Sequence, residues 1–249
     1  MNCGIRIADC GIRNPGVGTS SKLESEIWKG FTNVEAIILL GAPGSGKGTT
    51  AEKIRAVTGY VHVSTGDMLR EAVRKETRVG HEAESFMERG ALVPDEIMIR
   101  LVEERLDSGS NSDLYMFDGF PRTIAQAELL EKSLRRRGVG ISHVFFLDTP
   151  RQVLIERLSG RRICRKCGVN YHVVNMPPKT EGVCDACGGE LYQRPDDQKK
   201  TIIKRLEVYN RQTEGLISRY EEQNLLVRID SNQSVEKIIL EIVDMLKRG

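Results

Sequence analysis

A glycine-rich segment contains the residues of this chain that are best suited to chemistry: Gly41-Ala-Pro-Gly-Ser-Gly-Lys-Gly-Thr49. It follows an apolar run at 36–40 and precedes a helix-compatible sequence at 50–57. Glycines let the backbone curl so that several N–H groups face one phosphate, and a helix N-terminus adds partial positive charge. The segment therefore predicts a phosphate-binding loop of the Walker A type, in which Lys47 reaches the outer phosphates of a nucleotide. It departs from that pattern because Gly48 stands where Ser or Thr is usual, and Thr49 comes one place late.

Four of the six cysteines form two C-x-x-C pairs, Cys164/Cys167 and Cys184/Cys187, with sixteen residues between the pairs. Each pair places two thiolates in one tight turn, and four thiolates make a closed tetrahedral site of the structural kind. The segment between the pairs is too short and turn-rich to bury a core, so a metal would supply folding energy. Zinc, iron and cobalt all suit such a site, and the alternative is four unliganded cysteines.

The overall composition excludes several classes of protein. The chain has 249 residues, 37 basic and 35 acidic, so its formal charge of +2 gives no sign of general nucleic-acid binding. No apolar run approaches the roughly 20 residues that cross a bilayer, and the beginning of the chain lacks the apolar core of a secretory signal. We therefore expect a soluble, cytoplasmic protein.

The first 33 residues differ from the rest. The sequence Cys-Gly-Ile-Arg occurs at 3–6 and again at 10–13, and a stretch rich in Gly, Pro and Ser follows. We expect a poorly ordered extension at 1–33 or an over-extended start of the reading frame, because such residues favour little regular structure. A targeting peptide is the alternative.

From residue 34, short apolar segments alternate with longer segments of helical periodicity. The predicted strands are 36–40, 60–64, 114–117, 143–147 and 225–229, and the predicted helices are 52–57, 95–106, 124–137, 150–158, 199–222 and 235–247. This alternation predicts an α/β fold with a parallel sheet covered by helices on both faces. Ligands bind such sheets at the carboxyl ends of the strands, where Gly41, Ser64-Thr-Gly-Asp67, Asp118-Gly-Phe-Pro-Arg122 and Asp148 lie.

These polar groups suit phosphoryl transfer. Asp118 ends a predicted buried strand, as a carboxylate facing a magnesium–nucleotide complex often does. The reaction needs positioning and charge neutralisation more than a covalent nucleophile, and planar arginine forks suit its transition state. Arginines occur near many turns and segment ends: Arg70, Arg122, Arg161, Arg162, Arg194 and Arg205.

Taken in order, these motifs resemble the adenylate kinase family, in its long form with a zinc-binding lid. Besides the loop at 41–49, the matching stretches are Ser64-Thr-Gly-Asp-Met-Leu-Arg70, Gly90-Ala-Leu-Val-Pro-Asp95, Asp118-Gly-Phe-Pro-Arg-Thr123 with Gln126, Gly160-Arg-Arg162, and Arg194-Pro-Asp-Asp197 with Arg205. The Gly48-Thr49 arrangement is itself the form found in nucleoside monophosphate kinases. The resemblance covers essentially all of 34–249.

The resemblance implies a fold, a reaction and a domain organisation. The fold would be a P-loop five-stranded parallel sheet with helices on both faces and two inserted subdomains. An NMP-binding insert at 64–93 and a lid at 160–197 would close over the acceptor and the donor. The reaction would be reversible phosphoryl transfer from MgATP to AMP, giving two ADP, for adenine nucleotide homeostasis.

It also implies a role for each matching residue. ATP would contact Gly44, Ser45, Gly46, Lys47, Gly48, Thr49, Arg157, Arg161 and Gln233. AMP would contact Thr65, Arg70, Ala91, Leu92, Val93, Gly119, Arg122, Gln126, Arg194 and Arg205, with Thr65 and Gln126 favouring AMP over other acceptors. Lys47, Arg122, Arg161, Arg194 and Arg205 would be catalytic. Asp67 and Asp118 would orient waters around magnesium, and Cys164, Cys167, Cys184 and Cys187 would hold structural zinc.

The cysteine pairs allow a second interpretation, in which the module is a nucleic-acid or protein recognition element on an ATPase. Arg161, Arg162, Arg165 and Lys166 next to the first pair favour it. However, the insertion lies between two arginine motifs already suited to phosphoryl transfer, and no aromatic-rich basic stripe accompanies it. We therefore expect ATP, AMP and ADP as partners, without nucleic acid or membrane, and a monomer as in the family.

Overall fold

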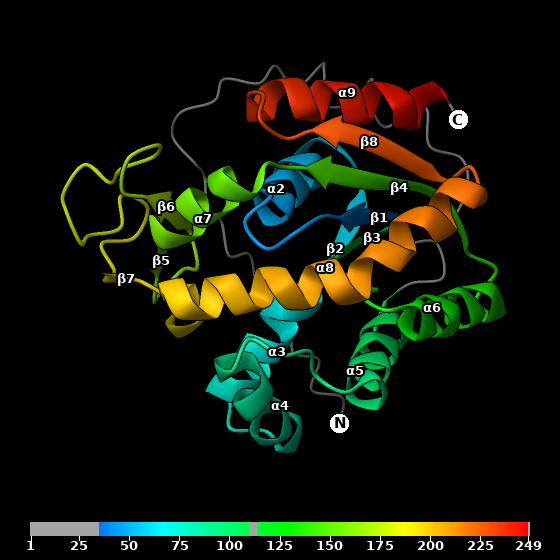
Figure 1. Cartoon of the computed structure of the whole chain (residues 1–249), viewed down its shortest axis with the longest axis horizontal. Coiled ribbons are helices and arrows are strands. Elements are labelled where there is room, and N and C mark those ends of the chain that lie inside the picture. Colours follow the sequence, from blue (N-terminus) through cyan, green and yellow to red (C-terminus); the bar gives the residue numbers. More distant parts are fainter. Residues whose placement is uncertain (1–34, 110–113, 249) are drawn as a thin grey trace, which may run out of the picture.

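A sheet of five parallel strands forms the centre of the computed structural model, which describes residues 35–109 and 114–248 (Figure 1). Its strands are β1 (Glu35–Leu40), β2 (Tyr60–Ser64), β3 (Leu114–Asp118), β4 (Gly140–Asp148) and β8 (Leu226–Asp230). Their order is β2-β3-β1-β4-β8, and every neighbouring pair is parallel. The predicted α/β fold with a five-stranded parallel sheet is therefore confirmed.

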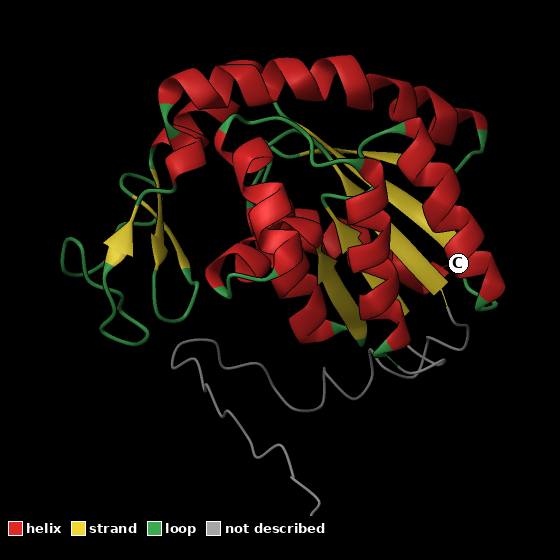
Figure 2. Ribbon diagram, turned by 90° about the horizontal axis from the view of Figure 1, so that it is seen from below, coloured by secondary structure: helices red, strands yellow, loops and turns green. Residues whose placement is uncertain are grey.

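Helices cover both faces of this sheet (Figure 2). On one face, Ile37 and Leu39 pack in a cluster with α2 (Lys47–Val57) and α9 (Val235–Arg248). On the other face, Ala36 and Ile38 pack with α5 (Asp95–Asp107), α6 (Ile124–Arg136) and α8 (Lys199–Glu222). Burial on both faces explains why β1 reads as a continuous apolar run instead of an alternating one.

Two excursions leave the central layers. After β2 the chain forms α3 (Thr65–Arg74) and α4 (Arg78–Glu88). After α7 (Arg151–Ser159), a separate antiparallel sheet of order β6-β5-β7 contains β5 (Arg161–Cys164), β6 (Asn170–His172) and β7 (Leu191–Tyr192), and a short 3-10 turn (Pro195–Asp197) leads back to α8. In Figure 1 this small sheet lies at the left, beside the first turns of α8.

The structure differs from the predicted elements in several places, and the short strands β5, β6 and β7 were not predicted. Helix α2 begins at Lys47 instead of 52, because the second half of the glycine-rich loop is already helical. Strand β4 begins at Gly140 instead of 143. Helices α3 and α4 were not predicted, although Ser64 and Thr77 cap them by accepting hydrogen bonds from the amides of Asp67 and Gly80.

Helices α3 and α4 pack closely at Gly80. A Cβ atom on this residue would lie 2.2 Å from the carbonyl oxygen of Ala72, so only glycine lets the two backbones approach this closely. The pair α3–α4 is therefore one compact hairpin attached to the end of β2.

No helix within the described residues is long and apolar enough to span a bilayer. The extension predicted at 1–33 lies outside these residues.

Candidate active site

A cavity of about 700 Å³ opens at the carboxyl ends of the central strands. It is lined by residues from the loop after β1, from α3, from the turn after β3, from the small sheet and from α8. Every residue predicted to contact ATP, AMP or magnesium lines this one cavity, from Gly44 to Gln233. Segments almost 200 residues apart in the sequence thus meet at one place, as expected for a parallel sheet.

The glycine-rich loop adopts a conformation that side chains would prevent. Gly44 and Gly46 have φ angles of +86° and +98°. A Cβ atom on Gly41 would lie 2.7 Å from Ser45 Oγ and 2.9 Å from the carbonyl oxygen of Leu147. Gly46 is the N-cap of α2 and provides no side-chain hydrogen bond. The first amides of α2 are therefore free of a side-chain cap and are suited to bind an anion.

Lys47 lies in the first turn of α2 and folds over the loop. Its Nζ atom donates hydrogen bonds to the carbonyl oxygens of Gly41 at 2.7 Å and Ala42 at 2.9 Å. Burial lowers the pKa of Lys47 to about 8, while the nearby Asp118 carboxylate opposes this effect. The side chain therefore stays mostly protonated at neutral pH and presents a cation above the loop.

Asp118 stands at the end of β3 and faces the start of α2. A Cβ atom on Gly48 would lie 3.6 Å from Asp118 Oδ2, so the position that usually holds Ser or Thr borders directly on this carboxylate. His62 Nε2 lies 3.3 Å from the same oxygen and fixes the side chain. A carboxylate is a ligand type that Mg²⁺ accepts directly or through water. Asp67, the other predicted magnesium residue, instead pairs with Arg70 at 2.5 Å, and its side chain is 62% exposed.

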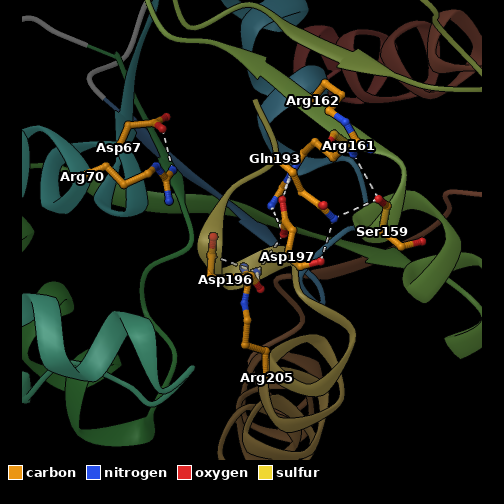
Figure 3. A network of polar contacts seen from close by, with 9 residues as sticks. All are labelled: Asp67, Arg70, Ser159, Arg161, Arg162, Gln193, Asp196, Asp197 and Arg205. Atoms are coloured by element: carbon orange, nitrogen blue, oxygen red, sulfur yellow. Dashed lines mark hydrogen bonds and ion pairs between the residues drawn. The ribbon is translucent and has the colours of Figure 1, made fainter. Parts of the chain in front are cut away.

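A buried carboxylate joins two of the predicted catalytic arginines (Figure 3). Asp197 is fully buried and accepts two hydrogen bonds from Arg161, at 2.8 and 2.6 Å, and one from Arg205 at 3.2 Å. Arg205 also pairs with Asp196 at 2.9 Å. The two guanidinium groups come from the base of the small sheet and from α8, so Asp197 connects them. Both aspartates belong to the Arg194–Asp197 motif, but no role was predicted for them. An acidic pair in a sequence with so many arginines near turns is a signal that could have indicated it.

The basic residues around the cavity are close enough to lower one another's pKa values. Burial lowers the pKa of Arg122 to about 10, and Arg205 adds to the effect. Burial also lowers the pKa of Arg194 to about 9, with contributions from Arg70 and Arg161. Among the described residues, no group accepts a hydrogen bond from Arg194 Nε. Buried cations in excess of their carboxylates favour a strongly anionic ligand such as a chain of phosphates.

The acceptor end of the cavity is built around the turn after β3. Thr65 Oγ1 donates to the carbonyl oxygen of Gly119 at 3.1 Å, and Arg122 Nε donates to the same oxygen at 2.8 Å. Gln126 is buried, and its amide accepts from the backbone N–H of Arg122 at 2.7 Å and donates to Asp95 at 2.6 Å. The amide expected to favour AMP as the acceptor therefore also orients the turn that carries Arg122.

Arg157 and Gln233, two of the residues predicted to contact ATP, also line the cavity. Arg157 Nη2 donates to the carbonyl oxygen of Ser231 at 2.9 Å, which anchors α7 to the loop after β8. Gln233 Nε2 donates to Glu241 at 3.0 Å, so the Gln233 side chain turns toward α9. Gln233 nevertheless lines the cavity.

The four cysteines of the small sheet form one cluster. Cys164 and Cys187 Sγ lie 3.4 Å apart, Cys167 and Cys184 Sγ lie 3.5 Å apart, and all four sulfurs are within 4.8 Å of one another. A tetrahedral zinc site with Zn–S bonds of about 2.3 Å requires sulfur separations of about 3.8 Å. The donor set and its dimensions therefore fit a tetrahedral metal.

The surroundings of Cys184 favour its thiolate form. Burial opposes ionisation of Cys184, but a hydrogen bond from Tyr171 and backbone amides lower the pKa of this thiol to about 6. His172 and Asp185, which are ligand types by chemistry, point elsewhere. His172 Nδ1 accepts from the amides of Val174 and Asn175, and Asp185 accepts from the amide of Lys179. The cysteines alone thus form the candidate metal site.

The fold and this site define a P-loop phosphotransferase: a glycine-rich anion-binding loop on a parallel sheet faces converging arginines. The family model described as Adenylate kinase matches residues 39–225. The chain is 49% identical to the adenylate kinase of Carboxydothermus hydrogenoformans, over 85% of this chain and 99% of the relative. It is 49% identical to that of Caldicellulosiruptor saccharolyticus and 47% identical to that of Bacillus subtilis, over 84% of this chain and 98% and 97% of the relatives. The chain belongs to the adenylate kinase family.

Proposed function

We propose that this chain transfers a phosphoryl group reversibly from MgATP to AMP and gives two molecules of ADP. The observation that carries this proposal is the single cavity that combines a phosphate-binding loop at one end with the Thr65–Arg122 acceptor region at the other. Four arginines from separate elements, Arg122, Arg161, Arg194 and Arg205, face the space between them. All these residues belong to one chain, which supports a monomeric enzyme.

The donor nucleotide would bind along the loop and α2. Amides from Gly44 to Thr49 would hold its phosphates, and Lys47 would exchange its carbonyl partners for outer phosphate oxygens. Asp118, together with Asp67, would hold the waters of a magnesium ion. That ion would neutralise charge on the phosphate oxygens during transfer.

The acceptor would bind between α3 and the turn after β3. Arg70 and Arg122 would contact the AMP phosphate, and the backbone of Ala91, Leu92 and Val93 would line the adenine pocket. Residues 64–93 and 160–197 would act as closing subdomains that exclude water from the transferring group and so prevent hydrolysis. Arg161, Arg194 and Arg205 would then complete the charge stabilisation of the transition state.

We expect AMP to be preferred over GMP, CMP and UMP by about a hundredfold in kcat/KM, because a pocket shaped for one base leaves polar groups of another unpaired. Initial rates with each acceptor at fixed MgATP measure this preference. Each ATP consumed should give two ADP, and consumption should stop without AMP. A yield of one ADP per ATP without AMP dependence would indicate a plain ATPase, and comparable rates with CMP would contradict the assigned specificity.

We further propose that the four-cysteine cluster holds a structural zinc. Removal of the metal by a chelator should lower the melting temperature by about 10 °C, because the small sheet has little apolar core to replace it. Calorimetry with and without added zinc measures the change. Cys184→Ser is the matched control, since chelation should add little to the effect of this substitution. An unchanged melting curve after verified metal loss would contradict a structural role.

A further inference from the structure

Three polar residues on α8, Arg205, Tyr209 and Thr213, line the cavity. They are spaced by four residues, which places them on one face of the helix. Arg205 pairs with Asp197, and Thr213 Oγ1 donates to the carbonyl oxygen of Arg122 at 3.2 Å. Arg205 is thus one of the arginines that face the phosphate region, and Thr213 holds the turn that carries another, Arg122. Tyr209 lies between them on the helix and has no role in the proposed reaction.

The Tyr209 hydroxyl is buried, and no described residue forms a hydrogen bond with it. The rest of the side chain packs against a small apolar cluster that includes Ala42 of the glycine-rich loop and Leu158 of α7. A buried hydroxyl without a partner has lost its hydration without compensation. Tyr209 lines the cavity, so the hydroxyl lies close to the cavity surface, and a small movement of the side chain on ligand binding would bring it to a ligand atom.

The charges around the hydroxyl locate it near the phosphate region. Burial raises the pKa of Tyr209 far above its usual value, Asp148 adds to the effect and Arg122 opposes it. The phenol therefore stays protonated and can donate a hydrogen bond. Asp148 ends β4 and Arg122 follows β3, and these two strands flank β1, whose end carries the glycine-rich loop. Packing on Ala42 places Tyr209 over this same edge of the sheet.

We propose that the Tyr209 hydroxyl donates a hydrogen bond to a phosphate oxygen of a nucleotide bound in this cavity. The inference rests on the proposed function, because it requires nucleotide phosphates between Arg205 and Arg122. It makes Tyr209 a further substrate-binding residue of the reaction, which recognises phosphate and not the base.

Tyr220 provides a matched control on the same helix. Its hydroxyl is also buried without a hydrogen-bond partner among the described residues, but it packs in the core and does not line the cavity. Tyr209→Phe and Tyr220→Phe each remove one oxygen atom from α8 and preserve the ring. Only Tyr209→Phe should weaken nucleotide binding.

The test compares both variants with the wild-type chain in steady-state kinetics and in thermal shifts with ATP or AMP added separately. Tyr209→Phe should lower kcat/KM by about tenfold or more, the usual effect of losing a hydrogen bond to a charged group. It should also reduce the nucleotide-induced thermal shift, while the melting temperature without nucleotide stays equal or rises. Tyr220→Phe should retain wild-type kinetics and shifts.

Wild-type kinetics and shifts in Tyr209→Phe would overturn the proposal. A loss of activity that merely follows a lower melting temperature without nucleotide would also overturn it, because that pattern indicates a structural hydroxyl. If the wild-type chain showed no AMP-dependent ADP formation, the proposed function would fail instead. The thermal shifts with ATP and AMP would still decide whether Tyr209 binds phosphate.

Discussion

Lys47→Met is expected to lower turnover by about a thousandfold or more while the fold stays intact. Lys47 is buried over the loop, and its ammonium group bonds two loop carbonyls instead of a carboxylate. Methionine keeps the length and apolar stem of the side chain but removes the charge that would meet the transferring phosphoryl group. Coupled assays of ADP formation measure the loss, and circular dichroism checks the fold.

Lys53→Met is the control for this substitution. Lys53 lies on the same helix, but its side chain is about half exposed and pairs with Glu236 at 3.0 Å. Exposed ion pairs of this kind contribute little, so activity should remain at the wild-type level. Substantial activity in Lys47→Met, or equal losses in both variants, would contradict the role assigned to Lys47.

Asp197→Asn is expected to reduce turnover by about a hundredfold, because displaced catalytic groups lose their alignment with the reacting atoms. The neutral amide cannot accept the two hydrogen bonds of Arg161 and that of Arg205 together, so both guanidinium groups lose their common anchor. Removal of one partner from a buried charge pair also destabilises a protein by about 3 kcal/mol or more. Steady-state kinetics and denaturant unfolding measure the two effects.

Glu131→Gln is the control for Asp197→Asn, because it removes an ion pair that should affect stability but not catalysis. Glu131 on α6 pairs with Arg219 of α8 at 3.0 Å, in a more exposed ion pair away from the cavity. Its loss should lower the free energy of unfolding without a change in kcat. If Asp197→Asn behaved in the same way, Asp197 would be a structural residue only.

The parallel sheet could be predicted because burial on both faces makes its strands continuous apolar runs, as in β1. The hairpin of α3 and α4 was missed although the sequence carries a signal for it. Apolar residues recur at helical spacing, as at Leu69 and Val73 in α3 and at Val79 and Ala83 in α4. Helix α3 begins within the Ser64–Arg70 motif, which was interpreted as a ligand-binding segment. What the sequence does not show is the close packing of the two helices at Gly80.

The convergence of the strand-end motifs on one cavity was also predictable, since the carboxyl ends of parallel strands must meet. The roles predicted for individual residues rest instead on the family resemblance. The hydrogen bonds that these residues form with one another could not be predicted. Gln126 bonds Asp95 and the turn at Arg122, and Asp197 joins two arginines, because three-dimensional packing decides which polar groups lie within bonding distance. Tyr209 was missed because a tyrosine in an amphipathic helix looks like any other core residue.

Helix α8 is one unbroken rod of 24 residues that runs from the small sheet to the far side of the domain (Figure 1). At about 1.5 Å per residue, Arg205 and Thr213 are about 12 Å apart along its axis. The helix therefore fixes the distance between two parts of the site: the Asp197 carboxylate, which anchors Arg161 and contacts Arg205, and the turn that carries Arg122, which contacts Thr213. A single inserted residue between these positions would rotate one of them by about 100° away from the cavity. The length of this segment is thus as much a part of the site as any side chain in it.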